Sequence, residues 1–214
     1  MTDPGLDPLL EPGVIAVVRA RQATGLAALA RNLAAGGVRA LEITLTTPGA
    51  VEAIAEFTRA GAAPGTLIGA GTVLDAHDAR NVLDAGARFV VSPTLEPEVI
   101  HVCRDRNVPC LPGAFTPSEI LAAWRAGAAL VKLFPAAAVG PAFLRDLLGP
   151  LPFLRVVPSG GVSLESAGDW IRAGAAAVSV GSALLGAAPA DLATRARSFV
   201  TAVATARQSM ERTT

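Results

Sequence analysis

Residues 50–73 read AVEAIAEFTRAGAAPGTLIGAGTV, and this stretch contains the unit from which the fold is built. Residues 50–60 have the apolar spacing and the length of an amphipathic helix. Gly61 follows directly, where a glycine closes a helix in the left-handed conformation. The apolar run 67–73 then predicts a strand that is buried on both faces. The stretch is therefore one helix-glycine-strand unit.

The same unit recurs along the chain. Ala-Gly pairs that end helical patterns and precede apolar runs stand at 35–36, 60–61, 85–86, 126–127 and 173–174. Their spacings are 25, 25, 41 and 47 residues, so each longer interval holds one unmarked repeat, closing near Asn107 and near Gly149-Pro150. The sequence therefore predicts eight units.

Strands that alternate with helices favour an α/β fold with a parallel sheet, here a single-domain (β/α)8 TIM barrel. An open doubly wound sheet is the alternative, but no Gly-x-Gly-x-x-Gly motif follows the first strand. One domain over residues 1–214 is expected, with a short N-terminal extension (1–13) and a C-terminal helix over about 189–209. The predicted strands are 14–20, 40–45, 67–73, 89–93, 110–115, 130–135, 155–159 and 177–181.

Composition excludes several classes of protein. The 214 residues are 51% hydrophobic and carry 18 basic and 18 acidic side chains, so no net charge attracts nucleic acid or an anionic membrane. The longest uncharged run, 173–190, holds too few strongly apolar residues to span a bilayer. Residues 1–13 contain no Lys or Arg and lack the basic region of a secretory signal, which favours a cytoplasmic protein.

The few histidines and cysteines argue against metal chemistry. His77 and His101 have no second ligand at metal spacing. Cys103 and Cys110 fit a reducing compartment as small buried apolar residues. We therefore expect no metal site.

Lys132 is the only lysine in the chain, against 17 arginines, and it lies inside the predicted strand 130–135. Apolar neighbours favour the neutral amine, which is the nucleophilic form. This chemistry suits a Schiff base with a carbonyl substrate. A salt-bridged or snorkelling lysine is the alternative.

Glu42 is the only acidic residue within any predicted strand. A buried carboxylate must be paired or functional, so Glu42 either forms an ion pair with Lys132 or Arg19 or moves protons during catalysis. An amine nucleophile and one such carboxylate are the minimum set for carbon–carbon bond chemistry through an enamine.

Polar residues at four other strand ends are candidates for ligand binding. Arg19 ends the first strand and suits a carboxylate or a phosphate. Thr72 follows glycines that let a ligand approach the backbone, although it also fits as an ordinary strand residue. The glycine-rich turns Pro158-Ser159-Gly160-Gly161 and Val180-Gly181-Ser182 follow strands seven and eight, where such barrels hold phosphate with backbone N–H groups. A phosphorylated ligand is therefore predicted.

Several of these motifs together resemble one family. From about residue 14 to residue 185, their order and spacing are similar to those of the 2-keto-3-deoxy-6-phosphogluconate (KDPG) aldolase / 4-hydroxy-2-oxoglutarate aldolase family. The motifs are Glu42-Ile43-Thr44, Ile68-Gly69-Ala70-Gly71-Thr72-Val73, Ser92-Pro93, Pro112-Gly113, Lys132-Leu133-Phe134-Pro135, Ser159-Gly160-Gly161-Val162 and Val180-Gly181-Ser182.

The resemblance implies a homotrimer of barrels without metal or organic cofactor, which cleaves KDPG to pyruvate and glyceraldehyde 3-phosphate. It implies that Lys132 forms the Schiff base and that Glu42 is the general acid/base. It also implies a set of substrate contacts. The carboxylate and the pyruvyl group would contact Arg19, Thr72, Pro93 and Phe134, and the phosphate would contact Ser159, Gly160, Gly161, Gly181 and Ser182.

The chain departs from the family at two positions. Many members have an arginine four residues after the glutamate, where this chain has Thr46, so the carboxylate contact would fall on Arg19. The phosphate turn often begins with Thr and here begins with Ser159, which keeps the hydroxyl. The first departure leaves substrate choice open between KDPG, its galactonate epimer and 4-hydroxy-2-oxoglutarate.

Two other functions fit the same residues. A phosphate-binding barrel isomerase or epimerase would use Glu42 as the proton shuttle and Lys132 as an electrostatic clamp, without a covalent adduct. A sugar-phosphate sensor would bind a keto acid without turnover.

Overall fold

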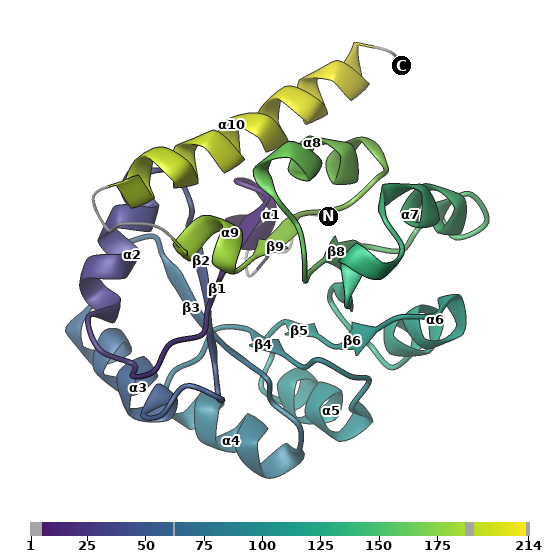
Figure 1. Ribbon diagram of the computed structural model, residues 1–214. Helices are drawn as coiled ribbons and strands as arrows, with labels where there is room; N and C mark the ends of the chain where they lie inside the picture. The colour runs from purple at the N-terminus through teal and green to yellow at the C-terminus, as the bar shows by residue number, and fades with distance from the viewer. Residues whose placement is uncertain (1–5, 62, 187–190, 213–214) are drawn as a thin grey trace.

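The computed structural model describes residues 6–61, 63–186 and 191–212, and its parallel strands curl into a barrel surrounded by helices (Figure 1). This confirms the predicted single-domain (β/α)8 barrel. The strands are β1 (Val14–Val18), β2 (Ala40–Thr44), β3 (Leu67–Gly71), β4 (Val90–Val91), β5 (Cys110–Leu111), β6 (Gly113–Ala114), β7 (Val131–Leu133), β8 (Val156–Pro158) and β9 (Val178–Val180). The helices are α1 (Asp7–Leu10), α2 (Leu26–Ala35), α3 (Ala50–Ala60), α4 (Ala76–Asp84), α5 (Pro97–Asp105), α6 (Pro117–Arg125), α7 (Pro141–Leu148), α8 (Leu164–Arg172), α9 (Ser182–Leu185) and α10 (Leu192–Glu211), with a 3-10 turn η1 (Ala136–Ala138).

The strands pair in the orders β5-β4-β3-β2-β1-β9 and β6-β7-β8. β5 and β6 are halves of one predicted strand, separated at Pro112, which has no N–H to donate to the sheet. The Pro112 carbonyl still accepts the Lys132 N–H at 2.9 Å. A bridge between Ser159 and Ser179 joins β8 to β9 on the other side. Because β5 and β6 together make one strand of the barrel, the described strands complete an eight-stranded barrel.

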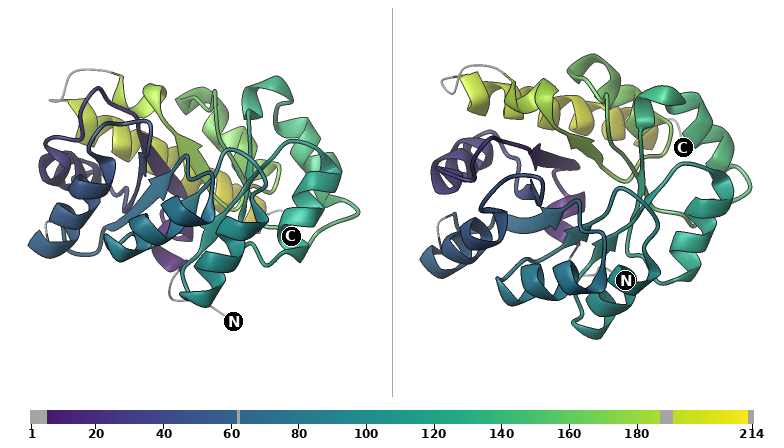
Figure 2. Two further views of the ribbon diagram at one scale, coloured as in Figure 1. Left: turned by 90° about the horizontal axis from the view of Figure 1, so that it is seen from below. Right: turned by 60° about the horizontal axis from the view of Figure 1, so that its bottom comes forward.

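Apolar residues divide into two clusters according to the alternation of side chains along each strand. Val14, Ala16 and Val18 of β1 belong to the larger cluster, which lies between the strands and the helices. Ile15 belongs to the smaller cluster, which fills the barrel interior. Leu6, directly before α1, and Leu9, within it, join this inner cluster, so α1 packs across the amino-terminal end of the barrel (Figure 2).

Residues outside the repeats form the two ends of the chain. In the predicted extension 1–13, residues 1–5 lie outside the described part, and α1 occupies Asp7–Leu10. For the C-terminal helix placed at about 189–209, residues 189–190 lie outside the described part, and α10 runs over Leu192–Glu211. α10 packs along α8 and α2 on the outside of the barrel (Figure 1).

The predicted strands extend too far at their carboxyl ends. The third, predicted at 67–73, ends at Gly71 because Thr72 has a φ of 60°, which no strand accommodates. The first, predicted at 14–20, ends at Val18. The residues beyond these ends form the loops at the carboxyl face of the barrel, which is where such barrels bind their ligands.

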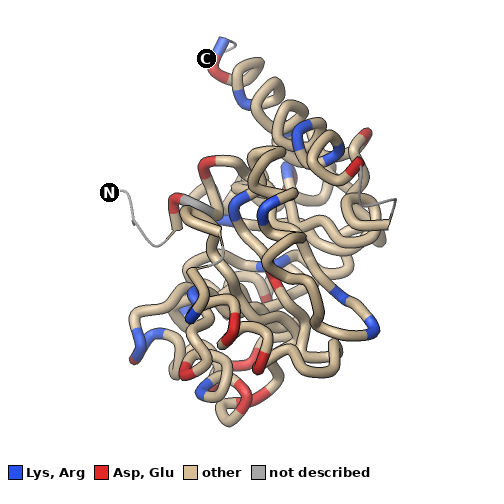
Figure 3. Tube along the Cα trace, turned by 90° about the vertical axis from the view of Figure 1, so that its left-hand side faces the viewer, with Lys and Arg blue, Asp and Glu red and all other residues tan. Residues whose placement is uncertain are grey.

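Charges of both signs occur along the outer elements on the face drawn in Figure 3. No helix in the described part of the chain combines the length and the apolar character that a membrane crossing requires.

Candidate active site

Glu42 and Lys132 point into the barrel because of their positions in the strand alternation. In β2, Ala40 packs in the inner cluster, whereas Leu41 and Ile43 pack outward. Glu42 is therefore the next inward position above Ala40. Val131 and Leu133 of β7 also pack outward, so Lys132 between them faces inward. The amine and the carboxylate thus lie above the apolar floor of the barrel.

The two groups form a buried pair. Lys132 Nζ lies 3.6 Å from Glu42 Oε1, and the two side chains are 9% and 2% exposed. The ring centroid of Phe134 lies 5.2 Å from the same amine nitrogen. This pairing matches one structural alternative for Glu42, and it also places a proton-accepting oxygen beside a potential nucleophile.

A cavity of about 590 Å³ opens above this pair, at the carboxyl face of the barrel. Its lining brings together every residue that the sequence singled out for the site. These are Arg19, Glu42, Thr72, Pro93, Lys132, Phe134, Ser159, Gly160, Gly161, Gly181 and Ser182. Further lining residues, which sequence reasoning missed, are Val17, Val162, Ser163, Ser179, Ala183, Leu185 and Gly186.

Ser179 is the most informative of the missed residues. Ser159 Oγ donates a hydrogen bond to Ser179 Oγ at 3.3 Å, and both serines are 4% exposed. The signal for Ser179 is its place in Val178-Ser179-Val180, where the two valines pack outward and the serine faces inward. The Ser159 hydroxyl therefore has a partner within the barrel wall.

The turn after β8 presents backbone rather than side chains to the cavity. Gly160 and Gly161 have φ values of 83° and 84°, a conformation that glycine adopts without strain. The chain then enters α8 through Ser163, whose side chain accepts the Ser166 N–H at 3.3 Å. Consecutive backbone N–H groups in such a turn suit an anion.

Hydroxyl groups at the end of β2 and in the loop that follows it hold the end of β1, next to Arg19. Thr44 Oγ1 donates to the Val18 carbonyl at 3.2 Å, and Thr47 Oγ1 accepts the Ala20 N–H at 3.2 Å. Thr46 Oγ1 lies 3.0 Å from Thr44 Oγ1. Thr46, which replaces the family arginine, thus joins a hydroxyl network that includes the backbone on both sides of Arg19.

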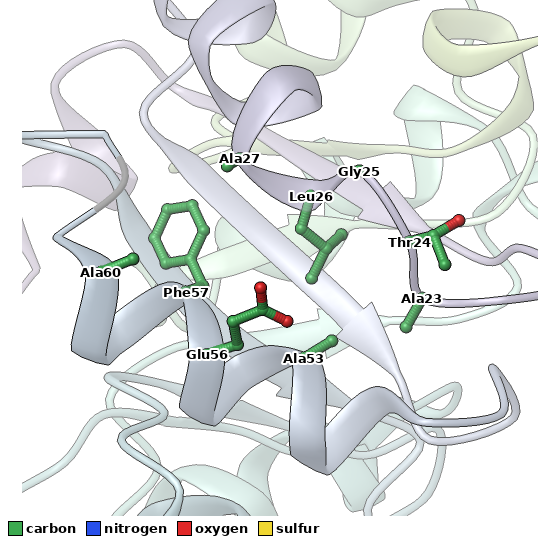
Figure 4. Close-up of a pocket in the computed structure, with 9 residues that line it drawn as sticks. All are labelled: Ala23, Thr24, Gly25, Leu26, Ala27, Ala53, Glu56, Phe57 and Ala60. Atoms are coloured by element: carbon green, nitrogen blue, oxygen red, sulfur yellow. The ribbon is translucent and has the colours of Figure 1, made fainter.

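A second hollow, of about 320 Å³, lies on the outside of the barrel between α2 and α3. Figure 4 shows the Glu56 carboxylate between the side chains of Phe57 and Leu26. Glu56 is the only ionisable residue in its lining, and none of the residues predicted for the site lies there. The residues predicted for the site therefore lie in the cavity inside the barrel and not in this hollow.

A barrel that places one lysine beside one carboxylate, under a glycine-rich turn, has the groups that a lyase of the lysine-dependent aldolase class requires. The family "KDPG and KHG aldolase" matches residues 7–195, and the chain belongs to this family. Among curated relatives, the 2-dehydro-3-deoxy-phosphogluconate aldolase of Pseudomonas aeruginosa is 41% identical over 162 residues, covering 75% of this chain and 73% of the relative. A probable 2-dehydro-3-deoxy-6-phosphogalactonate aldolase of Rhizobium meliloti is 35% identical, covering 83% of this chain and 84% of the relative.

Solved structures agree with this assignment. The KDPG aldolase of Legionella pneumophila, with pyruvate captured as a covalent carbinolamine intermediate, superposes with a TM-score of 0.78 at 30% identity, covering 95% of this chain and 98% of the other. A protein cage designed by fusing symmetric oligomeric domains superposes with a TM-score of 0.87 at 32% identity, covering 94% of this chain and 75% of the other.

Proposed function

We propose that the protein is a class I aldolase that cleaves KDPG to pyruvate and glyceraldehyde 3-phosphate. The observation that carries the proposal is the buried contact of 3.6 Å between Lys132 Nζ and Glu42 Oε1 at the base of the barrel cavity. The covalent pyruvate adduct of the Legionella pneumophila relative supports it.

In this mechanism, the neutral Lys132 amine attacks the C2 carbonyl, and loss of water gives an iminium. Glu42 accepts the proton of the C4 hydroxyl. The C3–C4 bond breaks, its electron pair moves into the iminium to form an enamine, and the aldehyde leaves. Protonation of the enamine at C3 and addition of water then release pyruvate and regenerate the amine.

In this proposal, the two ends of the substrate contact different residues of the cavity lining. Arg19 and Thr72 would hold the carboxylate, and Pro93 and Phe134 would pack around the pyruvyl group. Because the Ser159 hydroxyl donates to Ser179, the phosphate donors in this proposal are mainly backbone N–H groups of the two glycine-rich turns. The Ser159 N–H donates to the Leu133 carbonyl at 3.0 Å, so the N–H groups proposed for the phosphate are those of Gly160, Gly161, Gly181 and Ser182, and Ser159 lines the cavity beside them.

Substrate choice within the family is tested by one assay. The protein should release pyruvate fastest from KDPG when it is compared with the galactonate epimer and with 4-hydroxy-2-oxoglutarate. The Rhizobium meliloti relative makes the epimer the second candidate. Fastest release from the epimer would reassign the substrate and leave the aldolase chemistry in place.

We also propose a cytoplasmic homotrimer. The match to a cage built from symmetric oligomeric domains supports self-association. Leu74 and Phe115 are 49% and 37% exposed in the loops after β3 and β6, where a neighbouring subunit would cover them. A charged phosphate ester does not cross a bilayer readily, so enzyme and substrate should share a compartment. Sedimentation at micromolar concentration tests whether the protein is a trimer. Cell fractionation tests whether it is cytoplasmic.

Borohydride trapping tests the covalent mechanism. Pyruvate should form an iminium on Lys132 that borohydride reduces to a stable secondary amine, and the mass gain should map to the peptide with the only lysine of the chain. Lys132→Arg should abolish turnover while the protein stays folded, because a guanidinium remains protonated and forms no Schiff base. Failure to trap pyruvate in an active preparation would favour an isomerase or epimerase in which Glu42 is the proton shuttle and Lys132 is only an electrostatic clamp.

A further inference from the structure

We propose that Gly71 is a positioning residue for this reaction, because its lack of a side chain leaves the space in which the Glu42 carboxylate meets Lys132. The inference rests on the proposed aldolase function. It assigns a role to a residue that does not itself line the cavity.

The register of β2 and β3 places the glycines beside Glu42. Glu42 aligns with Gly69 and Thr44 aligns with Gly71. The Leu45 N–H donates to the Gly71 carbonyl at 2.8 Å, which extends this register to the end of both strands. Ala70 packs in the outer cluster, so Gly69 and Gly71 on either side of it face the barrel interior.

The two glycines make room for different groups. A Cβ at Gly69 would lie 2.6 Å from the ring of Phe89, which fills the barrel floor. A Cβ at Gly71 would overlap Glu42 Oε1 and would lie 2.7 Å from Glu42 Cδ and Cγ. The Glu42 side chain therefore occupies the volume that any other residue at position 71 would fill.

The displaced atom is the one that matters for the chemistry. Glu42 Oε1 is the oxygen 3.6 Å from Lys132 Nζ. Gly71 lies outside the positive-φ region, so an alanine can adopt its backbone conformation. The group that an alanine would meet is the end of a flexible side chain and not backbone, so the carboxylate should move while the barrel stays folded.

Gly71→Ala tests the inference. The variant should still trap pyruvate on Lys132 under borohydride, whereas kcat for pyruvate release should fall about 100-fold, the scale of a lost acid/base. Glu42→Ala removes the overlap, so the double variant should be no slower than Glu42→Ala. The Tm losses of the two single changes should then be less than additive. Gly149→Ala is the matched control, because its Cβ would meet only the Asp146 carbonyl at 3.5 Å, and its kcat should equal that of the parent.

The outcomes separate this inference from the function on which it rests. A Gly71→Ala variant with turnover within threefold of the parent would overturn the positioning role alone. A double variant slowed by the product of the two single losses would also overturn it, because independent effects multiply. A parent protein that releases no pyruvate and traps none would overturn the proposed function and this inference with it.

Discussion

Glu42 and Lys132 occupy positions that would hold apolar side chains if the barrel served stability alone. Each lies one inward position above the apolar floor formed in part by Ala40 and Leu130. Burying either charge without a partner is costly, and loss of one member of a buried pair leaves the other uncompensated, at about 3–5 kcal/mol. The contact of 3.6 Å between Lys132 Nζ and Glu42 Oε1 therefore offsets the cost of burying these two reactive groups and holds them side by side.

At this scale we predict that Glu42→Gln lowers turnover by about 100-fold or more, because the amide cannot accept the hydroxyl proton. Pyruvate should still be trapped on Lys132. Steady-state pyruvate release measures the effect. Glu56→Gln, in the hollow between α2 and α3, is the control, and its rate of pyruvate release should match that of the parent. Glu42→Gln turnover within a few-fold of the parent would remove Glu42 from the mechanism.

Residues that break the pattern of their element could be identified from sequence. Lys132 and Glu42 are charged positions in otherwise apolar strands, and both line the cavity. The alternation in Val178-Ser179-Val180 indicates that Ser179 faces inward but not that its hydroxyl meets Ser159, and Thr47 has no such signal because hydroxyl residues are common in turns. Their contacts depend on which strands become neighbours. The glycines before Thr72 were interpreted as space for a ligand, but Phe89 and Glu42 occupy the space facing Gly69 and Gly71.

At the scale of elements, the glycine-marked repeat predicted every strand of the barrel but not where each strand ends. Hydrophobicity continues past the last sheet hydrogen bond, since the loops at the carboxyl face are themselves half-buried around the cavity. The break at Pro112 was also missed. The next residue, Gly113, must be a glycine because its backbone packs against Pro93, and a Cβ at Gly113 would overlap the Pro93 carbonyl. Such long-range packing has no local signal in the sequence.

The loop after β2 should control how well the end of β1 presents Arg19. Thr47→Val removes the acceptor for the Ala20 N–H, so we predict a several-fold rise in KM for KDPG with kcat nearly unchanged. Thr66→Val is the control, because the structure gives the Thr66 hydroxyl no hydrogen-bond partner and Thr66 directly precedes β3, at the amino-terminal end of the barrel, and its KM should stay within twofold of the parent. Equal KM values for Thr47→Val and the parent would contradict this role.

The start of α6 should make stability depend on pH. Glu119 Oε2 accepts the Thr116 N–H at 2.8 Å and the Phe115 N–H at 3.0 Å, and these bonds lower the pKa of the Glu119 carboxyl. A carboxyl with a lowered folded pKa stabilises the fold above its unfolded pKa, about 4.3, and this contribution is lost as pH falls through the folded pKa.

Glu119→Ala should therefore lower the free energy of unfolding by about 0.5–1 kcal/mol at pH 7, and the difference from the parent should shrink below about pH 4. Urea unfolding across this pH range measures both quantities. Glu98→Ala, an exposed acid in the first turn of α5, should show a smaller difference. A Glu119→Ala difference that is constant from pH 7 to pH 3 would exclude the cap as its cause.

At the scale of the whole molecule, the ends of the chain close the barrel. α1 covers the amino-terminal end, and α10 runs along the outside and brings Arg207 to the same region. The Arg207 guanidinium donates to the carbonyls of Leu10, Glu11 and Ala176 at 2.8, 2.8 and 2.9 Å. These contacts lie outside the repeat, so periodicity gave no indication of them.

Arg207 should consequently contribute to stability and not to catalysis. Burial lowers the pKa of its guanidinium, but an arginine stays protonated, so three carbonyls share one charged donor. Arg207→Met keeps a long apolar side chain but leaves the three carbonyls without their charged donor. We predict that the free energy of unfolding falls by about 2–3 kcal/mol while kcat for pyruvate release is unchanged. Arg197→Met is the control, because Arg197 makes one exposed bond to the Ala35 carbonyl at 3.2 Å, and it should cost less than about 1 kcal/mol. Equal losses of unfolding free energy in the two variants would show that the three Arg207 hydrogen bonds add no particular stability. A fall in kcat for Arg207→Met alone would show that these bonds also affect the active site.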